Sequence, residues 1–290
     1  MSAQGNIENH FVRYDCIEIP TKSQTNWEHI FIRDGLSVKY RQSDEDDHAL
    51  LAFKYMPANR LLENIENNDF AFVSPIKWRD PFESLFFENN IIIDKKYVNV
   101  KGLCFALNDF ENEEGLWHFS PFSSVSNDNP TIRVAFDMLK FYQRLEDYAI
   151  KKENVDFYIS LVNYKDTSEI LRLQENFKPQ SIDDYINKLC LKRQAYKHEI
   201  ELRIFMVKKS EQESSNDDVE KISIPKIKEI ISSVTLPPCD PLEYGIHLCP
   251  KCYNNKQQSS NKTTYDKFKK LDIRVKYSEL YDIYTIRNRQ

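Results

Sequence analysis

Two glutamates and an arginine alternate along the stretch from His198 to Val207. The residues between them are mostly apolar, and this period of two predicts a half-buried β-strand with Glu199, Glu201 and Arg203 on one face. Neighbouring carboxylates on such a face lie roughly 7 Å apart, so in a cleft they need Arg203 or another cation nearby. The stretch is therefore either the charged wall of a site or a solvated strand face.

The turn from Ser74 to Ser84 is the second stretch that could contribute to a site. Its two prolines place it outside regular structure, and Trp, Arg, Asp and Glu follow one another closely within it. Glu83 is the candidate site residue of this turn. In the alternative interpretation, Trp78 and Phe82 simply anchor the turn to the core, and Asp80-Pro81 makes an ordinary turn.

Trp117 and His118 are adjacent, and each has two interpretations. The indole of Trp117 belongs either to the core or to a wall on which an adenine or nicotinamide ring stacks. A histidine such as His118 is more often a hydrogen-bonded structural side chain than a catalytic base.

The cysteines raise the question of a metal site. Cys249 and Cys252 form a Cys-x-x-Cys pair, and Cys239 and His247 are close enough in sequence to complete four zinc ligands. Because the second pair lacks the usual spacing, we expect a thiol-bearing loop without metal, with a structural zinc site as the alternative. The six cysteines are scattered, which favours reduced thiols over a disulfide framework.

Composition and charge narrow the classes of function. A 290-residue chain that is 41% hydrophobic and 13% aromatic can build a sizeable core. The net charge of -5 gives no overall electrostatic footprint for nucleic acid. The five glycines are too scattered to form a dinucleotide-binding or Walker-type phosphate loop. The polar N-terminus and the lack of a long apolar window predict a cytoplasmic protein without membrane contact.

Strand-like and helix-like segments are interleaved irregularly, without a repeat. This pattern predicts an α+β fold with a mixed, mostly antiparallel central sheet and interleaved helices. We expect an N-terminal extension over residues 1–49, with short strands and the acidic loop Ser43–His48, and a single α+β domain over residues 50–290. The expected strands are 51–55, 70–73, 101–107, 131–136, 157–164, 198–207, 230–236 and 271–277, and the expected helices are 59–67, one from Asp137, 168–175 and 181–196, the last capped by Ser181.

Five segments of the chain follow one another in the order and at the spacing of a known bacterial family. They are the Lys54-Tyr55 pair, the turn Trp78–Glu83, the strand Leu103-Cys104-Phe105, the segment Leu116–Phe119, and the series Lys192, Tyr196, Glu199, Glu201 and Arg203. Over about residues 50–280 the chain thereby resembles the family known as domain of unknown function 2971. It departs from the family pattern at Arg79, Phe119 and Tyr196, where Asn, Tyr and Trp are usual.

The layout of that family is similar to a compact ADP-ribosyltransferase scaffold, and this resemblance implies a use for NAD. Glu199 and Glu201 would then be the catalytic carboxylates that stabilise an oxocarbenium-like centre as nicotinamide leaves. The expected cofactor contacts are Lys54, Tyr55, Arg60, Glu83, Trp117, His118 and Arg203.

Two functions are favoured at this point over a hydrolase or a nuclease. One is an NAD-using toxin or phage-defence effector that modifies a macromolecular acceptor. The other is a non-enzymatic module of a defence or toxin system that binds a ligand or a partner protein.

Overall fold

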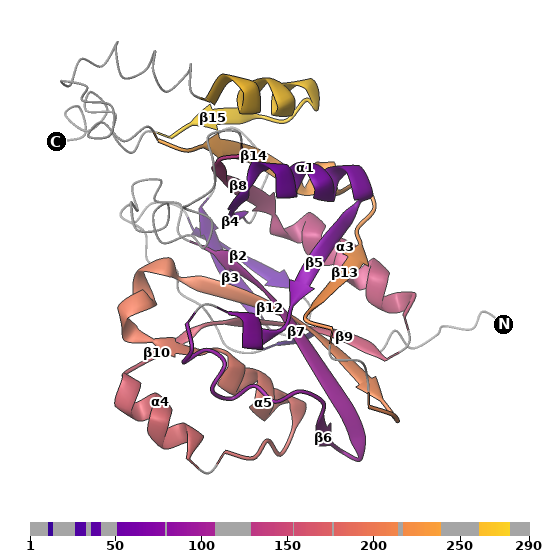
Figure 1. Ribbon diagram of the computed structural model, residues 1–290, viewed down its shortest axis with the longest axis vertical. Helices are drawn as coiled ribbons and strands as arrows, with labels where there is room; N and C mark the ends of the chain where they lie inside the picture. Colours follow the sequence, from indigo (N-terminus) through magenta and orange to yellow (C-terminus); the bar gives the residue numbers. More distant parts are fainter. Residues whose placement is uncertain are drawn as a thin grey trace. The chain divides into compact units, whose positions relative to one another are not determined.

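Helices and strands are interleaved in the computed structural model (Figure 1), which confirms the predicted α+β class with a mixed, mostly antiparallel sheet. The structure describes residues 11–13, 27–32, 36–41, 51–78, 80–107, 129–152, 154–175, 177–213, 217–238 and 261–278. The chain divides into two compact units. The first comprises Met1–Leu50, Phe70–Phe105 and Phe141–Ile224, and the second Leu51–Asp69, Ala106–Lys140 and Pro225–Gln290.

In the first unit, four strands lie in the order β1-β9-β12-β7. They are β1 (Phe11–Arg13), β9 (Val155–Leu161), β12 (Glu201–Ser210) and β7 (Lys96–Ala106). Strands β5 (Asp69–Val73) and β6 (Ile91–Ile93) pair antiparallel with β7, and β13 (Val219–Ser223) pairs with β5. A separate hairpin joins β2 (Trp27–Ile32) to β3 (Leu36–Arg41).

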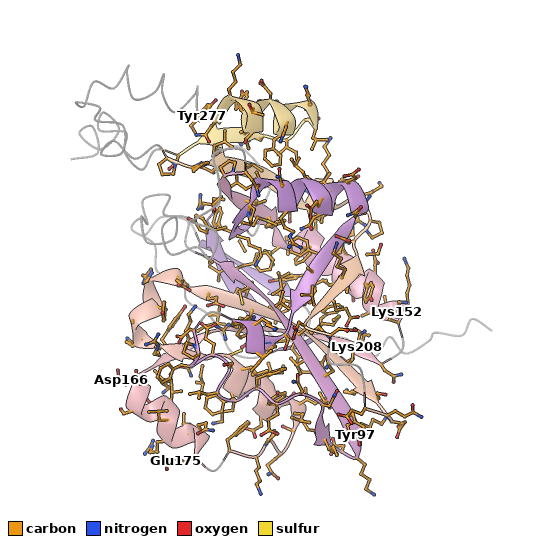
Figure 2. The ribbon with its side chains drawn as sticks, in the orientation of Figure 1. Tyr97, Lys152, Asp166, Glu175, Lys208 and Tyr277 are labelled. Carbon is orange, nitrogen blue, oxygen red and sulfur yellow. The ribbon has the colours of Figure 1, made fainter. Side chains whose placement is uncertain are left out.

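Helices and a short second sheet complete this unit. Asp166 and Glu175, labelled in Figure 2, flank helix α4 (Thr167–Gln174). Helix α5 (Ile182–Leu189) follows and leads into β11 (Leu191–Arg193), which pairs in parallel with β10 (Asn163–Lys165). Helix α3 (Met138–Ile150) begins in the second unit and ends in the first.

The second unit has the strand order β4-β8-β14-β15. Strands β4 (Leu51–Pro57), β8 (Thr131–Asp137) and β14 (Ile231–Leu236) are antiparallel neighbours, and β15 (Val275–Tyr277) lies parallel to β14. Helix α1 (Ala58–Asn67) follows β4 directly, and the one-turn helix η3 (Ile227–Ile230) precedes β14. Residues 261–270 form a further helix.

Strand β12 lies at the centre of the first unit's core. Its residues Glu201–Val207 are buried on both faces, so the prediction of a half-buried strand is wrong. Phe205 and Val207 pack in a cluster with Tyr185, Ile186 and Leu189 of α5. Helix α5 begins where predicted, because the Ser181 hydroxyl accepts a hydrogen bond of 3.1 Å from the Asp184 amide.

The segment between α5 and β12 differs most from the expectation. The helix predicted over 181–196 ends at Leu189, and β11 is followed by the 3₁₀ helix η2 (Gln194–Glu199). Ile200 has a positive φ of 43°, and β12 begins only at Glu201. His198 and Glu199 therefore belong to a helical turn and not to the predicted strand.

The structure does not test two of the predictions. The acidic loop 43–48 lies outside the described residues, and the division at residue 50 stays a prediction. Within the part of the chain that the structure describes, no helix is long and apolar enough to cross a membrane.

Candidate functional site

A buried lysine joins the predicted carboxylates in the first unit. Lys192, on β11, places its Nζ 2.9 Å from Glu83 Oε1, 2.6 Å from Glu199 Oε2 and 2.7 Å from Glu201 Oε2. An ammonium group has three donors, and each of these carboxylates can accept one. The side chain of Lys192 is only 8% exposed, so these contacts replace nearly all of its water. We call Glu83, Lys192, Glu199, Glu201 and Arg203 the carboxylate cluster.

Arg203 supports the same carboxylates from β12. Its Nε donates to Glu201 Oε1 at 2.7 Å, and its Nη2 lies 3.3 Å from Glu201 Oε2 and 3.2 Å from Glu83 Oε2. Its Nη1 donates to the Leu189 carbonyl at 2.6 Å. The guanidinium is fully buried, and this two-point contact with Glu201 is the strong form of an arginine–carboxylate pair.

An indole covers Arg203. The ring of Trp78 lies with its centroid 4.3 Å from Arg203 Cζ, a cation–π contact. The indole approaches β7 closely, because a Cβ added at Gly102 would lie 2.5 Å from Trp78 Cζ2. Gly102 therefore makes room for the ring that covers the guanidinium.

Local backbone geometry explains why two neighbouring carboxylates reach one ammonium group. Left-handed geometry at the β-branched Ile200 is uncommon, and it separates η2 from β12. In a regular strand Glu199 and Glu201 would stand roughly 7 Å apart; across this bend both contact Lys192 Nζ. The Glu201 amide donates to the Tyr164 hydroxyl at 2.9 Å, which fixes the start of β12 against β10.

Three carboxylates meet two cations, so the fully ionised cluster has one excess negative charge. Burial raises the pKa of Glu83, and the charge of Glu201 raises it further, while Arg203 and Lys192 oppose the shift. Burial alone would also raise the pKa of Glu201, but Arg203 and Lys192 together lower it to about 2. For Lys192, burial lowers the pKa, and the three carboxylates outweigh it and raise the pKa above its usual value. Glu201 is therefore ionised at neutral pH, and Glu83 takes a proton more readily than Glu201 does.

Exposure separates the three carboxylates. The side chain of Glu199 is 22% exposed, whereas those of Glu83 and Glu201 are nearly covered. Among the described residues, the Glu199 carboxylate contacts Lys192 only, and it does so through Oε2. Glu199 is thus the carboxylate of the cluster that an external molecule can reach.

The structure brings together four of the predicted site residues: Glu83, Glu199, Glu201 and Arg203. They are not arranged as the exposed wall of a cleft, because Glu201 and Arg203 are buried. The cofactor contact expected of Arg203 gains no support from this geometry, since its nitrogens already bind Glu83, Glu201 and the Leu189 carbonyl.

The other predicted residues lie elsewhere. Lys54 and Tyr55 are on β4 and Arg60 is on α1, all in the second unit. Trp117 and His118 lie outside the described residues, as do the candidate zinc ligands Cys239, His247, Cys249 and Cys252. In the described part of the chain, no group of three or more His, Cys, Asp or Glu side chains could hold a metal ion. The expectation about zinc therefore stays untested.

Sequence reasoning missed the central cation. Lys192 belongs to the motif that resembles the family, but it received no role in the predicted site. One feature of the sequence pointed to it: Lys192 directly follows the apolar run Leu189-Cys190-Leu191, all of which is buried. Tyr164 gave no comparable signal, because its hydroxyl binds a backbone amide 37 positions away.

Comparison of the chain with protein-family models, with curated proteins and with solved structures finds no match. The resemblance to the domain of unknown function 2971 stays a prediction, and so does the likeness to ADP-ribosyltransferases.

Proposed function

We propose that the chain uses a nucleotide such as NAD, and that Glu199 is the carboxylate that faces the ribose. One observation supports this proposal: three carboxylates converge on Lys192, and Glu199 is the one among them that is appreciably exposed. An oxocarbenium-like centre is positively charged. A carboxylate that is fixed in place and partly shielded from water stabilises this charge without having to reorient during the reaction. The excess negative charge of the cluster suits this task.

The proposed reaction has two steps, and Glu199 is the residue that faces the reacting carbon in both. The bond between the ribose carbon and the nicotinamide nitrogen breaks, and its electron pair stays with nicotinamide, which leaves as a neutral molecule. A water molecule or an acceptor group then attacks the ribose carbon and releases one proton to Glu199 or to solvent. Lys192 acts as a positioning residue because its buried ammonium group binds Glu199, and the buried Glu201 in turn binds Lys192.

The test is to incubate the protein with labelled NAD, with and without cell lysate, and to measure nicotinamide release and label transfer. We expect the Glu199→Gln variant to lose at least about 100-fold in rate. Glu169→Gln is the matched control, because Glu169 forms a surface ion pair with Lys165 and lies outside the carboxylate cluster. Equal rates for the wild type and Glu199→Gln would contradict the proposal.

A second candidate function is a non-enzymatic module that binds a partner protein. It is favoured by the environment of the two cations, since the three donors of Lys192 face three carboxylates and the side chain of Arg203 is fully buried. In that case the carboxylate cluster is structural and joins β11 and η2 to β12. Absence of nicotinamide release in every condition, together with a protein that copurifies in stoichiometric amount, would favour this candidate.

A further inference from the structure

Arg193 follows Lys192 on β11, but its side chain is partly exposed to solvent. The Lys192 side chain is buried in the carboxylate cluster, whereas that of Arg193 is 30% exposed. Alternate residues of a strand point to opposite faces, so one short strand supplies a buried cation and a solvent-facing cation.

Two aromatic rings and two hydrogen-bond acceptors contact the guanidinium of Arg193. Its Cζ lies 4.7 Å from the ring centroid of Phe82 and 5.2 Å from that of Tyr196. Its Nε donates to Asp80 Oδ2 at 3.0 Å, and its Nη2 donates to the Tyr196 hydroxyl at 3.1 Å. Asp80 is itself fixed, because its Oδ1 accepts a hydrogen bond from the Phe82 amide. The planar group is therefore oriented before any ligand arrives.

Hydrogen-bonding capacity remains on this guanidinium. Arginine has five N–H donors, and the described residues accept from Nε and Nη2 only. The fork geometry of the guanidinium fits phosphate oxygens, and a group already oriented by rings and hydrogen bonds loses little entropy on binding. Tyr196 also connects Arg193 to the carboxylate cluster, since its ring centroid lies 4.9 Å from Lys192 Nζ.

We propose that Arg193 is an anion-binding subsite that takes a phosphate group of the substrate, with Phe82 and Tyr196 holding its guanidinium in place. This inference rests on the proposed function, in which Glu199 faces the ribose. It assigns the phosphate contact to a residue that the sequence did not single out, in place of the fully buried Arg203.

The first test is isothermal titration calorimetry with inorganic pyrophosphate as the probe. We expect Arg193→Gln to weaken binding at least about tenfold, as the loss of a charged donor implies. Arg193→Lys keeps the charge and loses the fork, so it should weaken binding by less than Arg193→Gln does. Arg172→Gln, an exposed arginine on α4, is the matched control and should bind as the wild type does. A wild type that does not bind pyrophosphate, or an Arg193→Gln variant that binds it equally well, would overturn the proposal.

The second test uses Asp80, the carboxylate that neutralises Arg193. Asp80→Asn keeps an oxygen for the Phe82 amide and removes the competing charge, so pyrophosphate should bind several-fold more tightly. A purely structural role for the Asp80–Arg193 pair predicts lower thermal stability with no gain in affinity, and that result would overturn the subsite.

The two proposals can fail separately. Pyrophosphate binding needs no glycosidic chemistry, so binding that depends on Arg193 without any nicotinamide release would sustain the subsite and refute the reaction. Nicotinamide release that depends on Glu199, with an unchanged KM for NAD in Arg193→Gln, would sustain the reaction and refute the subsite.

Discussion

At the scale of single residues, Ile200 determines where two carboxylates point. Its φ of 43° is unusual for a β-branched side chain, and left-handed geometry costs an ordinary residue about 1–2 kcal/mol. The surrounding contacts offset this cost, among them the hydrogen bonds that Glu201 makes with Lys192 and Arg203. Backbone strain of this kind is typical of functional sites, and here it separates the exposed Glu199 from the buried Glu201.

The two carboxylates should differ in their contribution to stability. In Glu201→Gln the new amide hydrogens face Lys192 or Arg203, so a buried cation loses an acceptor, and we expect a loss of about 3 kcal/mol in the free energy of unfolding. Glu199→Gln should cost less than about 1 kcal/mol, because Lys192 keeps two carboxylates and Glu199 is partly hydrated. Urea unfolding measures both values. A larger loss in Glu199→Gln than in Glu201→Gln would contradict this order.

Stability should respond to pH with opposite signs at Glu201 and Glu83. The pKa of Glu201 is lowered from 4.5 to about 2 in the fold, so its contribution is fully present above pH 4.5 and is lost as the pH falls toward 2. The pKa of Glu83 is raised above 4.5, so its contribution is present below pH 4.5 and is lost as the pH rises through its folded value.

The variants Glu83→Gln and Glu201→Gln separate the two pH dependences of the free energy of unfolding. The difference in free energy of unfolding between the wild type and Glu83→Gln should fall as the pH rises above 4.5. The same difference for Glu201→Gln should rise between pH 2 and pH 4.5. Unfolding curves at a series of pH values test both, and two slopes of the same sign would be inconsistent with the assignment of charges.

The sequence allowed part of this residue-level picture to be predicted. The structure brings Glu83, from a distant turn, to the same Lys192 and Arg203 that bind Glu201, although Glu199 lies outside the predicted strand. The role of Lys192 was not predicted, because periodicity describes faces of elements and does not show which side chains meet across them. The bend at Ile200 was equally invisible, since isoleucine gives no signal for a positive φ.

At the scale of elements, the turn that carries Glu83 is fixed from two sides. Trp78 packs between Gly102 of β7 and Arg203 of β12, and Asp80 pairs with Arg193 of β11 at 3.0 Å. The interpretation of Trp78 as an anchor and that of Glu83 as a site residue are therefore compatible. The anchored turn places Glu83 in the carboxylate cluster.

Gly102→Ala should disturb this arrangement. The added methyl group would lie 2.5 Å from Trp78 Cζ2, so the indole must move away from Arg203, and overpacking of this kind costs about 1–3 kcal/mol. A double-mutant cycle with Trp78→Leu is the control, because without the indole the same alanine should cost much less. Equal costs in the two backgrounds would show that Gly102 does not act through Trp78.

Elements with a clear period were predicted well, and short ones were not. Strands β4, β5, β8 and β14 and helix α1 lie within a few residues of their predicted positions. Strands β6, β11 and β13 were missed, and β6 and β11, with three residues each, are too short to show alternation. The helix predicted through Tyr196 was too long. Leu191 and Lys192, which the prediction placed in that helix, belong to β11, and β11 pairs in parallel with β10.

At the scale of the whole molecule, the interleaving of strand-like and helix-like segments predicted the fold class but not the division into two compact units. Each unit is assembled from segments that are far apart in the sequence, such as 51–69 and 225–290 in the second unit. The predicted cofactor residues divide along the same line, with Lys54, Tyr55 and Arg60 in one unit and the carboxylate cluster in the other. Arg193 contacts Tyr196, whose ring also lies near Lys192 of the cluster.

The ammonium group of Lys192 offers the most direct measurement of the carboxylate cluster. Its side-chain ¹⁵N resonance, identified by its absence in Lys192→Arg, can be followed as the pH is raised through 10.5, the usual pKa of lysine. Three carboxylates raise the pKa of this group, so we predict that its resonance stays at the protonated position past pH 10.5 for as long as the protein remains folded. A Lys192 resonance that titrates at or below pH 10.5 in the folded protein would contradict the cluster, and with it the placement of Glu199 on which the proposed function rests.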